Sequence, residues 1–436
     1  MVNSRTVQNV IAIIGIGLLC SGLNTKAFAC TTAVISGRAT IDGRPILWKN
    51  RDTRDTNHNE VIQWNDGKYK AIAVVNAGGK SAVWMGVNEA GFCIENSVSR
   101  DLSAEGEKKG PGNGGFMKLA LETCETVADF KRLLEETDKE GRKTIANFGV
   151  IDAKGGAALF ETGPYKHLMF DANDPATAPD GVIVRSNFAT SACELPAEPA
   201  PEQITEIASH DRYLRACSLL KKPDQPKISF DYVLRNCARD LCDAELAAIP
   251  GSVNSTEGSL PERISTANTI SRSFTVSVAV FHGVRPGEDP RLTTMWTMLG
   301  EPTFTIAVPC WVSSSEVAVQ LTGSRGSRLG ELANSLRTWN YVNEEDTLRG
   351  AGMPELWSKL WQVEDKIVEE TLRKREAWLK TEASTDELTK QHQAAVAEAY
   401  EALESAFTTA KQKALDQPSA PLPDFSLPLA TTPVTK

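Results

Sequence analysis

Short runs of hydrophobic residues separated by turn signals dominate residues 30–312. Residues 30–53 contain two β-rich runs separated by Asp42-Gly43, a dipeptide that is common at hairpin turns. Further strands are predicted at residues 69–75, 82–87, 92–95, 148–152, 157–161, 182–185, 274–281 and 303–312. This pattern predicts a fold built mainly from paired strands.

A helical spacing of apolar residues appears in two other regions. Residues 116–136 carry them along one side, which predicts a single helix that faces the core. Beyond residue 343 the spacing is four, three and four, at Leu356, Leu360, Val363 and Ile367. It recurs after a predicted break at residues 384–387, at Val396, Tyr400, Leu403, Phe407 and Ala410. The second region therefore predicts a helical hairpin, packed either on the main domain or on a second copy of the chain as a homo-oligomer.

These elements together predict an α+β fold in which two antiparallel sheets are covered by helices, with Cys30 at the start of a central strand. The expected boundaries are a main domain at residues 30–343, the helical hairpin at 344–416 and a tail at 417–436. The tail contains five prolines and is predicted to be disordered.

Residues 1–29 have the pattern of a secretory signal peptide. Arg5 precedes an apolar stretch at residues 10–23, and Ala27-Phe28-Ala29 provides small residues at the cleavage site. The apolar stretch is shorter than the roughly 20 residues that span a bilayer, which disfavours a retained anchor. We therefore expect a secreted or periplasmic protein with no membrane span after cleavage.

Charge and cysteine content narrow the classes of partner. The net charge is −9, which argues against nucleic acids and anionic membranes as partners. The chain has nine cysteines, and the close pair Cys237 and Cys242 is the expected local disulfide. No metal-binding motif occurs, so no metal and no cofactor are predicted. A small molecule is the expected partner.

Cleavage after Ala29 would place a thiol and a free α-amine on the same residue, Cys30. An α-amine titrates at about 7.7–8.0 and a thiol at about 8.5, so a proton can pass between them near neutral pH. The thiolate could then attack an amide carbonyl without help from a histidine. Two other interpretations remain: an ordinary cysteine, or the acylated cysteine of a non-enzymatic surface lipoprotein, although Phe28 fits a lipobox poorly.

Several short motifs support the enzymatic interpretation by their order and spacing. They are Cys30-Thr31-Thr32, Asp42-Gly43, Asn50-Arg51-Asp52 and the segments at residues 86–91, 147–152 and 185–188. In these motifs the chain resembles the N-terminal-nucleophile hydrolases of linear amides, namely the choloylglycine hydrolase and penicillin V acylase family. It resembles the isopenicillin N acyltransferase-like family more closely, and its first motifs are also similar to the cysteine dipeptidases of the same superfamily.

The resemblance implies a four-layer αββα Ntn-hydrolase sandwich in which residues 30–343 form the catalytic domain. It also implies transfer of an acyl group from a linear amide to Cys30, followed by hydrolysis of the thioester. An amine can replace water as the acceptor in such enzymes, so an acyltransferase is an alternative.

The resemblance also implies roles for individual residues. Asp52 corresponds to the aspartate that holds the amine of the nucleophile, and Asn187 to the asparagine that donates to the oxyanion. Arg212 corresponds to a late arginine near the active site. Asn96 corresponds to a second polar contact for the substrate.

Two cations precede the aspartate. The choloylglycine pattern has an arginine three residues before it, and this chain has Lys49 there and Arg51 next to Asp52. Lys49 and Arg51 are therefore candidate substrate-binding residues, and this departure predicts a different substrate preference.

Overall fold

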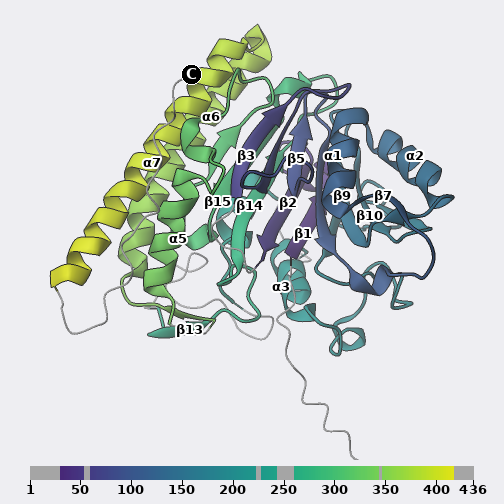
Figure 1. Ribbon diagram of the computed structural model, residues 1–436, viewed down its shortest axis with the longest axis horizontal. Coiled ribbons are helices and arrows are strands. Elements are labelled where there is room, and N and C mark those ends of the chain that lie inside the picture. Colours follow the sequence, from purple (N-terminus) through teal and green to yellow (C-terminus); the bar gives the residue numbers. More distant parts are fainter. Residues whose placement is uncertain (1–29, 54–58, 222–226, 243–259, 343–345, 417–436) are drawn as a thin grey trace, which may run out of the picture.

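The computed structural model describes residues 30–53, 59–221, 227–242, 260–342 and 346–416 (Figure 1). The predicted signal peptide and the predicted proline-rich tail lie outside these residues.

The first of two large sheets has six antiparallel strands, in the order β12-β1-β2-β14-β15-β16. Its strands are β1 (Cys30–Ile35), β2 (Ile46–Asp52), β12 (Val182–Arg185), β14 (Thr275–His282), β15 (Thr294–Leu299) and β16 (Val308–Cys310). Cys30 begins β1, which lies between β12 and β2.

The second large sheet has seven antiparallel strands, in the order β11-β10-β9-β6-β5-β4-β3. Its strands are β3 (Asn59–Trp64), β4 (Ala71–Asn76), β5 (Met85–Asn88), β6 (Cys93–Val98), β9 (Ala146–Ile151), β10 (Ala157–Thr162) and β11 (His167–Asp171). Short pairs lie outside the two sheets: β7 (Lys109–Gly112) with β8 (Arg142–Lys143), and β13 (Arg263–Ser265) with β17 (Thr347–Arg349).

Helices cover the outer face of each large sheet. On the seven-stranded sheet these are α1 (Asn113–Thr123) and α2 (Val127–Asp138), which pack through a cluster of buried phenylalanines: Phe92, Phe116, Phe130, Phe148 and Phe160. On the other side lie α5 (Arg328–Asn340), α6 (Met353–Thr381) and α7 (Thr385–Asp416) (Figure 1). The expected four-layer αββα arrangement with a C-terminal helical hairpin is therefore confirmed.

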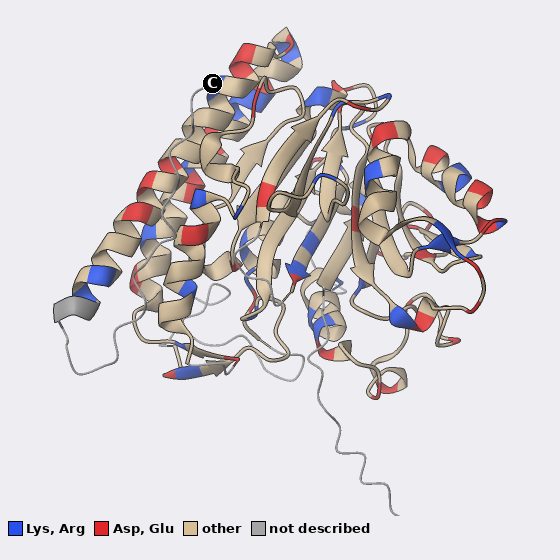
Figure 2. Cartoon of the chain, in the orientation of Figure 1, with Lys and Arg blue, Asp and Glu red and all other residues tan. Residues whose placement is uncertain are grey.

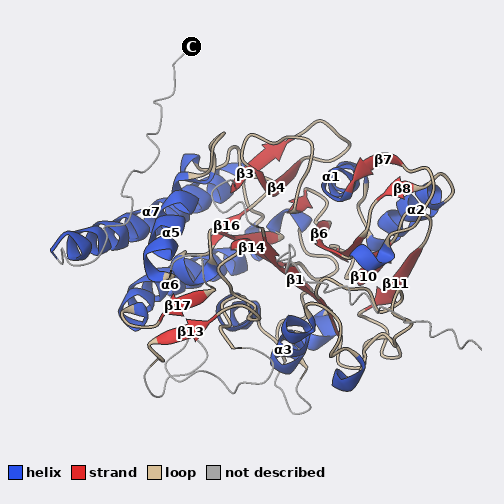
Figure 3. Ribbon diagram, turned by 60° about the horizontal axis from the view of Figure 1, so that its bottom comes forward, coloured by secondary structure: helices blue, strands red, loops and turns tan. Residues whose placement is uncertain are grey.

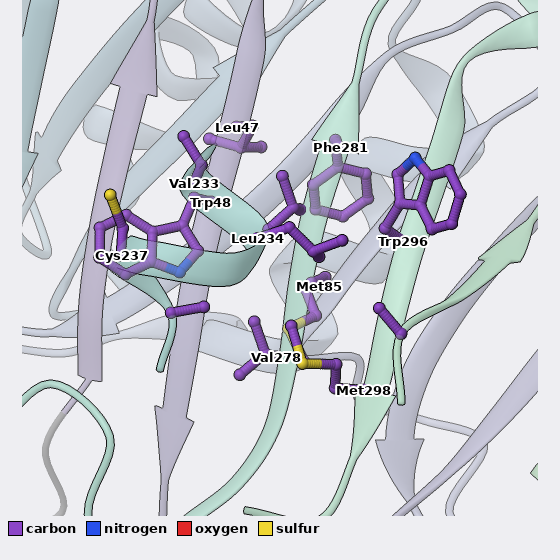
Figure 4. Packing of buried hydrophobic residues seen from close by; sticks show 14 of the residues in the cluster. Leu47, Trp48, Met85, Val233, Leu234, Cys237, Val278, Phe281, Trp296 and Met298 are labelled. Atoms are coloured by element: carbon purple, nitrogen blue, oxygen red, sulfur yellow. The ribbon is translucent and has the colours of Figure 1, made fainter. Parts of the chain in front are cut away.

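Smaller helical elements connect these layers. Helix α3 (His210–Leu220) lies against β1 and β12 (Figure 3), and α4 (Phe230–Tyr232) continues into a π-helical turn at Val233–Cys237. The 3-10 turns are Gly37–Ala39, Arg100–Leu102, Pro201–Gln203, Pro290–Leu292, Pro302–Phe304 and Val319–Leu321. The π-helical turn packs Val233, Leu234 and Cys237 onto the outer face of the six-stranded sheet, beside Trp48 (Figure 4).

The prediction of one helix over residues 116–136 was wrong. The chain breaks between α1 and α2, where Cys124 is extended with φ −94° and ψ 141°. Thr126 then caps α2 in a capping box with Asp129, which starts a new helix. Apolar spacing runs through both helices because they face the same core, so the spacing alone does not reveal the break.

The strand predicted at residues 303–312 is also shorter than expected. Only Val308–Cys310 form a strand, because Pro302 starts a 3-10 turn in which the Glu301 side chain accepts from the Thr303 backbone N–H. The neighbouring strand, β15, was not predicted.

The hairpin packs on the main domain of the same chain. Buried apolar side chains line its inner side, among them Trp357, Leu360 and Ile367 of α6 and Val396 and Leu403 of α7. Acidic and basic residues are interspersed along α6 and α7 (Figure 2). A homo-oligomer through this hairpin stays a prediction.

The expected disulfide between Cys237 and Cys242 is wrong: both side chains are buried thiols. Cys237 ends the π-helical turn on the outer face of the six-stranded sheet, and Asp240 accepts from the Cys242 backbone N–H in a separate turn. Within the ranges that the structure describes, no helix is both long and apolar enough to cross a membrane.

Candidate active site

The register of β1 and β2 brings the predicted nucleophile together with two cations. Cys30 pairs with Arg51, and Thr32 pairs with Lys49. Alternation along each strand puts these four side chains on one face, the face toward the seven-stranded sheet. Contacts confirm this direction, since Thr32 Oγ1 donates to Glu95 of β6. Cys30 itself is 8% exposed, so its thiol lies at the edge of the space between the sheets.

Asn187 holds the backbone nitrogen of Cys30. The Cys30 N–H donates to Asn187 Oδ1 at 2.6 Å, and Arg212 Nη2 donates to the same oxygen at 3.1 Å. On its other side, Asn187 Nδ2 donates to the Val98 carbonyl oxygen at 2.8 Å. Two donors at the oxygen and one acceptor at the nitrogen determine the orientation of the amide. Asn187 is therefore a direct partner of the nitrogen that would become the α-amine.

Arg212, which lies on α3, also contacts Cys30. Its Nη1 donates to the Cys30 carbonyl oxygen at 2.6 Å and to Thr31 Oγ1 at 2.9 Å. Burial lowers the pKa of Arg212 to about 10, against the opposing charge of Asp52. Because the guanidinium contacts the Cys30 carbonyl oxygen, the Thr31 hydroxyl and Asn187, it restrains the start of β1.

Ser209 links the two elements that carry these contacts. It precedes α3 in a left-handed conformation with φ 72°, which is uncommon for a residue with a side chain. Its Oγ accepts from the Asn187 backbone N–H at 3.1 Å, and its carbonyl oxygen accepts from Ser186 Oγ at 3.0 Å. The loop of Asn187 and the start of the Arg212 helix are thus joined.

Asp52 offers a buried acceptor. Its Oδ1 accepts from Thr275 Oγ1 at 2.8 Å, while Oδ2 lies 3.9 Å from Arg272 Nε. Among the described residues, nothing donates a hydrogen bond to Oδ2. Burial raises the pKa of Asp52, and the charges of Arg272 and Arg212 oppose that rise. Such an oxygen can receive an ammonium group.

Lys49 is a fully buried cation beside the nucleophile. Its Nζ donates to the Trp84 carbonyl oxygen and to Asn96 Oδ1, both at 2.8 Å. Burial lowers the pKa of Lys49, and the neighbouring Cys30 and Glu95 oppose this effect. The contact explains the position of Asn96: its amide oxygen orients the Lys49 ammonium.

Arg51 faces the same space but is held by amide groups. Its Nη1 donates to Asn59 Oδ1 at 2.5 Å and its Nη2 to Asn76 Oδ1 at 2.8 Å. The guanidinium also lies 4.5 Å from the centroid of the Trp84 ring. These contacts place a cation and an aromatic ring together near Cys30, a combination that can bind a polar or aromatic group.

The structure thus brings the predicted residues together in two groups. Asn187 and Arg212 contact Cys30 directly, and Lys49 contacts Asn96. Asp52 lies beside these groups and interacts with Arg212 through charge. The roles assigned to these residues stay predictions.

Several residues of the site were given no role from the sequence: Thr31, Thr32, Trp84, Glu95, Ser209, Arg272 and Thr275. Thr31 and Glu95 lie within predicted strands, directly next to Cys30 and Asn96, so this adjacency was the signal available. For Ser209 and Thr275 the sequence carries no local signal. Within the described part of the chain, no group of three or more His, Cys, Asp or Glu could hold a metal ion.

The sequence matches no known protein-family profile and no curated protein. The structure is similar to a Caenorhabditis elegans N-acylethanolamine-hydrolyzing acid amidase ortholog, with 14% identity over 58% of this chain and 92% of that chain and a TM-score of 0.39. It is also similar to penicillin V acylase from Agrobacterium tumefaciens, with 14% identity, 68% and 89% coverage and a TM-score of 0.34.

A third similar structure is a mutant of conjugated bile acid hydrolase from Clostridium perfringens. It is 13% identical to this chain over 62% of this chain and 89% of that chain, with a TM-score of 0.37. At these identities and TM-scores, the similarities assign neither a family nor an activity to this chain.

Proposed function

We propose that this chain, once cut before Cys30, is a cysteine N-terminal-nucleophile hydrolase that cleaves a linear amide C–N bond. The observation that carries the proposal is the contact of the Cys30 nitrogen with Asn187 Oδ1 at 2.6 Å, braced by Arg212. A half-buried amide that accepts from the nitrogen at the first residue of a central strand, and that a buried arginine orients, is what an N-terminal nucleophile requires. The motifs at residues 30–32 and 50–52 support the same reaction class.

In the proposed reaction the α-amine of Cys30 accepts the thiol proton and the thiolate attacks the amide carbonyl carbon. A C–S bond forms and the carbonyl oxygen becomes an oxyanion. Collapse breaks the C–N bond, and the leaving amine takes the proton from the α-ammonium. Water then adds to the thioester with the α-amine as base, which releases a carboxylic acid and restores the thiol.

Nearby side chains are suited to the charges that develop. The Asn187 amide nitrogen has two N–H groups, and one of them donates to the Val98 carbonyl oxygen. We assign the second to the oxyanion, where such a donor stabilises the transition state by a few kcal/mol. Asp52 Oδ2 is assigned to the α-ammonium. Arg51 with Trp84 is assigned to the acyl group.

Removal of residues 1–29 during export is the proposed source of the free amine, so the mature enzyme would be secreted or periplasmic. Two protein forms test this: one that begins at Cys30, and one that keeps a methionine before it. The first should hydrolyse an amide substrate, and the second should fold normally but be inactive because its base would be a peptide nitrogen. Full activity of the second form would contradict the mechanism.

The nucleophile is tested separately with two cysteine variants. Cys30→Ala should abolish turnover, whereas Cys193→Ala should not, although Cys193 is the more exposed thiol. Loss of activity on treatment with iodoacetamide should track alkylation of Cys30, as measured by mass spectrometry. If activity instead follows modification of Cys193, the nucleophile is elsewhere.

Two further measurements separate the alternatives. An added amine that captures the acyl group in competition with water would make the protein an acyltransferase. The mass of the mature N-terminal peptide shows whether the protein is a lipoprotein. In a lipoprotein a diacylglyceryl group would add several hundred daltons, and the α-amine would be blocked.

A further inference from the structure

A second buried acid lies close to the nucleophile, in the space between the sheets. Glu95 of β6 is completely buried. Its Oε1 accepts from Thr32 Oγ1, and the Gly149 backbone opposes the rise of its pKa. Among the described residues, nothing donates to its Oε2, which is also buried. A buried carboxylate with one unsatisfied oxygen is costly to maintain, which points to a purpose beyond packing.

The neighbouring strand is shaped to admit this carboxylate. Glu95 pairs with Gly149 of β9, and a Cβ atom on Gly149 would lie 2.2 Å from Glu95 Oε1. The same Cβ would lie 2.8 Å from Leu47 Cδ1. Any residue other than glycine at position 149 would therefore displace the carboxylate. The position of the Glu95 carboxylate thus requires a glycine on the neighbouring strand.

Lys49 is a buried cation whose pKa is affected by both the Glu95 carboxylate and the Cys30 thiol. An ammonium has three N–H groups, and two of those on Lys49 donate to the Trp84 carbonyl oxygen and to Asn96. Cys30 and Glu95 are the two acidic groups that most strongly favour its charged form. The strand register places this ammonium near both groups, because Lys49 pairs with Thr32, whose hydroxyl donates to Glu95, and faces the same side as Cys30.

The other charged groups around Glu95 are few. On β2, Arg51 lowers the pKa of Lys49 and Asp52 raises it. On α1, Lys118 and Glu122 pair with each other toward the outer surface. Among the described elements packed on β6, strands β5 and β9 carry no ionisable side chain, and β1 carries only Cys30.

We propose that Glu95 is a positioning residue which, through Lys49, shares one proton with Cys30. In one form the thiol keeps the proton and Glu95 is ionised beside Lys49. In the other form the proton lies on Glu95, and the Cys30 thiolate takes Lys49 as its counter-ion. The proton count is the same in both, and the second form holds a thiolate even before the α-amine acts as base. This inference deepens the proposed function and rests on Cys30 as its nucleophile.

The chemistry of Glu95 suits this exchange. Burial raises the pKa of Glu95 to about 7, while Lys49 and Thr32 oppose the rise. A carboxyl group that titrates in this range can hold or release a proton near neutral pH. Two anions beside one ammonium in a space of low dielectric constant repel each other, so ionisation of one favours protonation of the other.

The test is the rate of alkylation of Cys30 by iodoacetamide as a function of pH, in protein that begins at Cys30. Glu95→Gln imitates the protonated carboxyl group. The pH at which the alkylation rate is half-maximal should therefore be about one unit lower in this variant than in the unmodified protein. Lys49→Met removes the counter-ion and should shift the midpoint upward by a similar amount. These opposite shifts are not expected of a residue with a purely structural role.

Glu301→Gln is the matched control. Glu301 is equally buried, burial also raises its pKa to about 7, and it too accepts from hydroxyl groups, those of Ser271 and Thr303. It belongs to a different cluster from Cys30, so its substitution should cost similar stability without moving the alkylation midpoint. An equal shift in Glu301→Gln and Glu95→Gln would overturn the proposal.

Thr32→Val serves as a second variant if Glu95→Gln does not fold. Loss of the hydroxyl donor makes the Glu95 carboxyl hold its proton more firmly, so the Cys30 midpoint should again fall, by less than one pH unit. No shift, or an upward shift, in both Glu95→Gln and Thr32→Val would overturn the inference. Alkylation needs no substrate, so it can be measured even if the protein has no amidase activity. If the midpoints shift as expected in such a protein, the result would count against the proposed function alone.

Discussion

At the scale of single residues, the amide of Asn187 joins three parts of the site. Its oxygen meets the Cys30 nitrogen and Arg212, and its nitrogen meets the Val98 carbonyl oxygen. Asn187 was expected as an oxyanion donor alone. The oxyanion role stays a prediction, and the structure adds a contact that was not expected, because the same side chain also accepts from the Cys30 nitrogen.

Replacement of this side chain tests the oxyanion role. Asn187→Ala should lower kcat by roughly a hundredfold or more while leaving KM almost unchanged, because the oxyanion exists only in the transition state. The control is Asn88→Ala, which removes a buried asparagine that donates to the Leu121 and Cys124 carbonyl oxygens. This control should lower the melting temperature but preserve kcat. A higher KM with normal kcat in Asn187→Ala would make it a substrate-binding residue.

At the scale of elements, a neutral histidine joins β14 to α6. His282 Nε2 lies 2.7 Å from Asp42 Oδ2, and Arg375 Nη1 lies 2.8 Å from His282 Nδ1. Nδ1 must therefore accept from the guanidinium, which leaves Nε2–H to donate to the carboxylate. Burial and the charge of Arg375 lower the pKa of His282 to about 4.

This histidine predicts a dependence of stability on pH. Between pH 6.5 and 4 the unfolded chain binds a proton at His282 that the folded chain does not bind. The contribution of His282 to the free energy of unfolding is therefore lost as the pH falls through this range. Between pH 7 and pH 5 the loss should be about 2 kcal/mol. Urea unfolding at pH 7 and pH 5 gives the change in the free energy of unfolding between the two pH values. This change should be smaller in His282→Gln than in the unmodified protein by the same amount. An identical pH dependence in the two proteins would mean that folding does not shift the pKa of His282.

A buried carboxylate fastens the same helix to the domain. Glu364 of α6 accepts from Arg239 at 2.6 and 2.8 Å, from Arg235 and from the Ala307 backbone N–H. Glu364→Gln would leave Arg239 buried without its counter-ion, so it should destabilise the fold by about 3–5 kcal/mol. Glu369→Gln, an exposed position on the same helix, should change the melting temperature little. Equal melting temperatures for the two variants would show that the pair contributes no net stability.

At the scale of the whole molecule, the helical hairpin completes the core. The Trp357 indole N–H donates to the Thr303 carbonyl oxygen at 2.9 Å, and His392 Nε2 accepts from the Ala318 N–H at 2.9 Å. Apolar side chains of both helices belong to the same core cluster as β14 and β15. The hairpin therefore stabilises the six-stranded sheet on which Cys30 lies.

A truncated chain tests this dependence. Protein that lacks residues 344–416 would expose the apolar outer side of the domain, so it should be insoluble or lose cooperative unfolding. Protein that lacks only residues 417–436 is the control and should unfold like the full chain. A soluble and active protein without the hairpin would instead favour a role for it between copies of the chain, which light scattering of the full chain would reveal.

Much of the fold could be predicted because local patterns record which face of an element is buried. The runs at β1, β2, β9, β10 and β14 have the two-residue or continuous apolar pattern of strands. The break between α1 and α2 was missed because both helices bury the same side. Strand β15 was missed because Thr294 and Thr297, buried by the layers around them, weaken its apolar pattern.

The sequence by itself determined the chemistry available at the start of the main domain: a cysteine at position 30, with an aspartate, two cations and an asparagine at recognisable spacings. Only the tertiary structure decided which of these meet. Pairing of β1 with β2 brings Cys30 and Lys49 to one face, and packing of the two sheets puts Glu95 beside them. Burial between the sheets shifts the pKa values of Lys49 and Glu95 because the sheets exclude water, and burial of this kind depends on contacts between residues far apart in the chain.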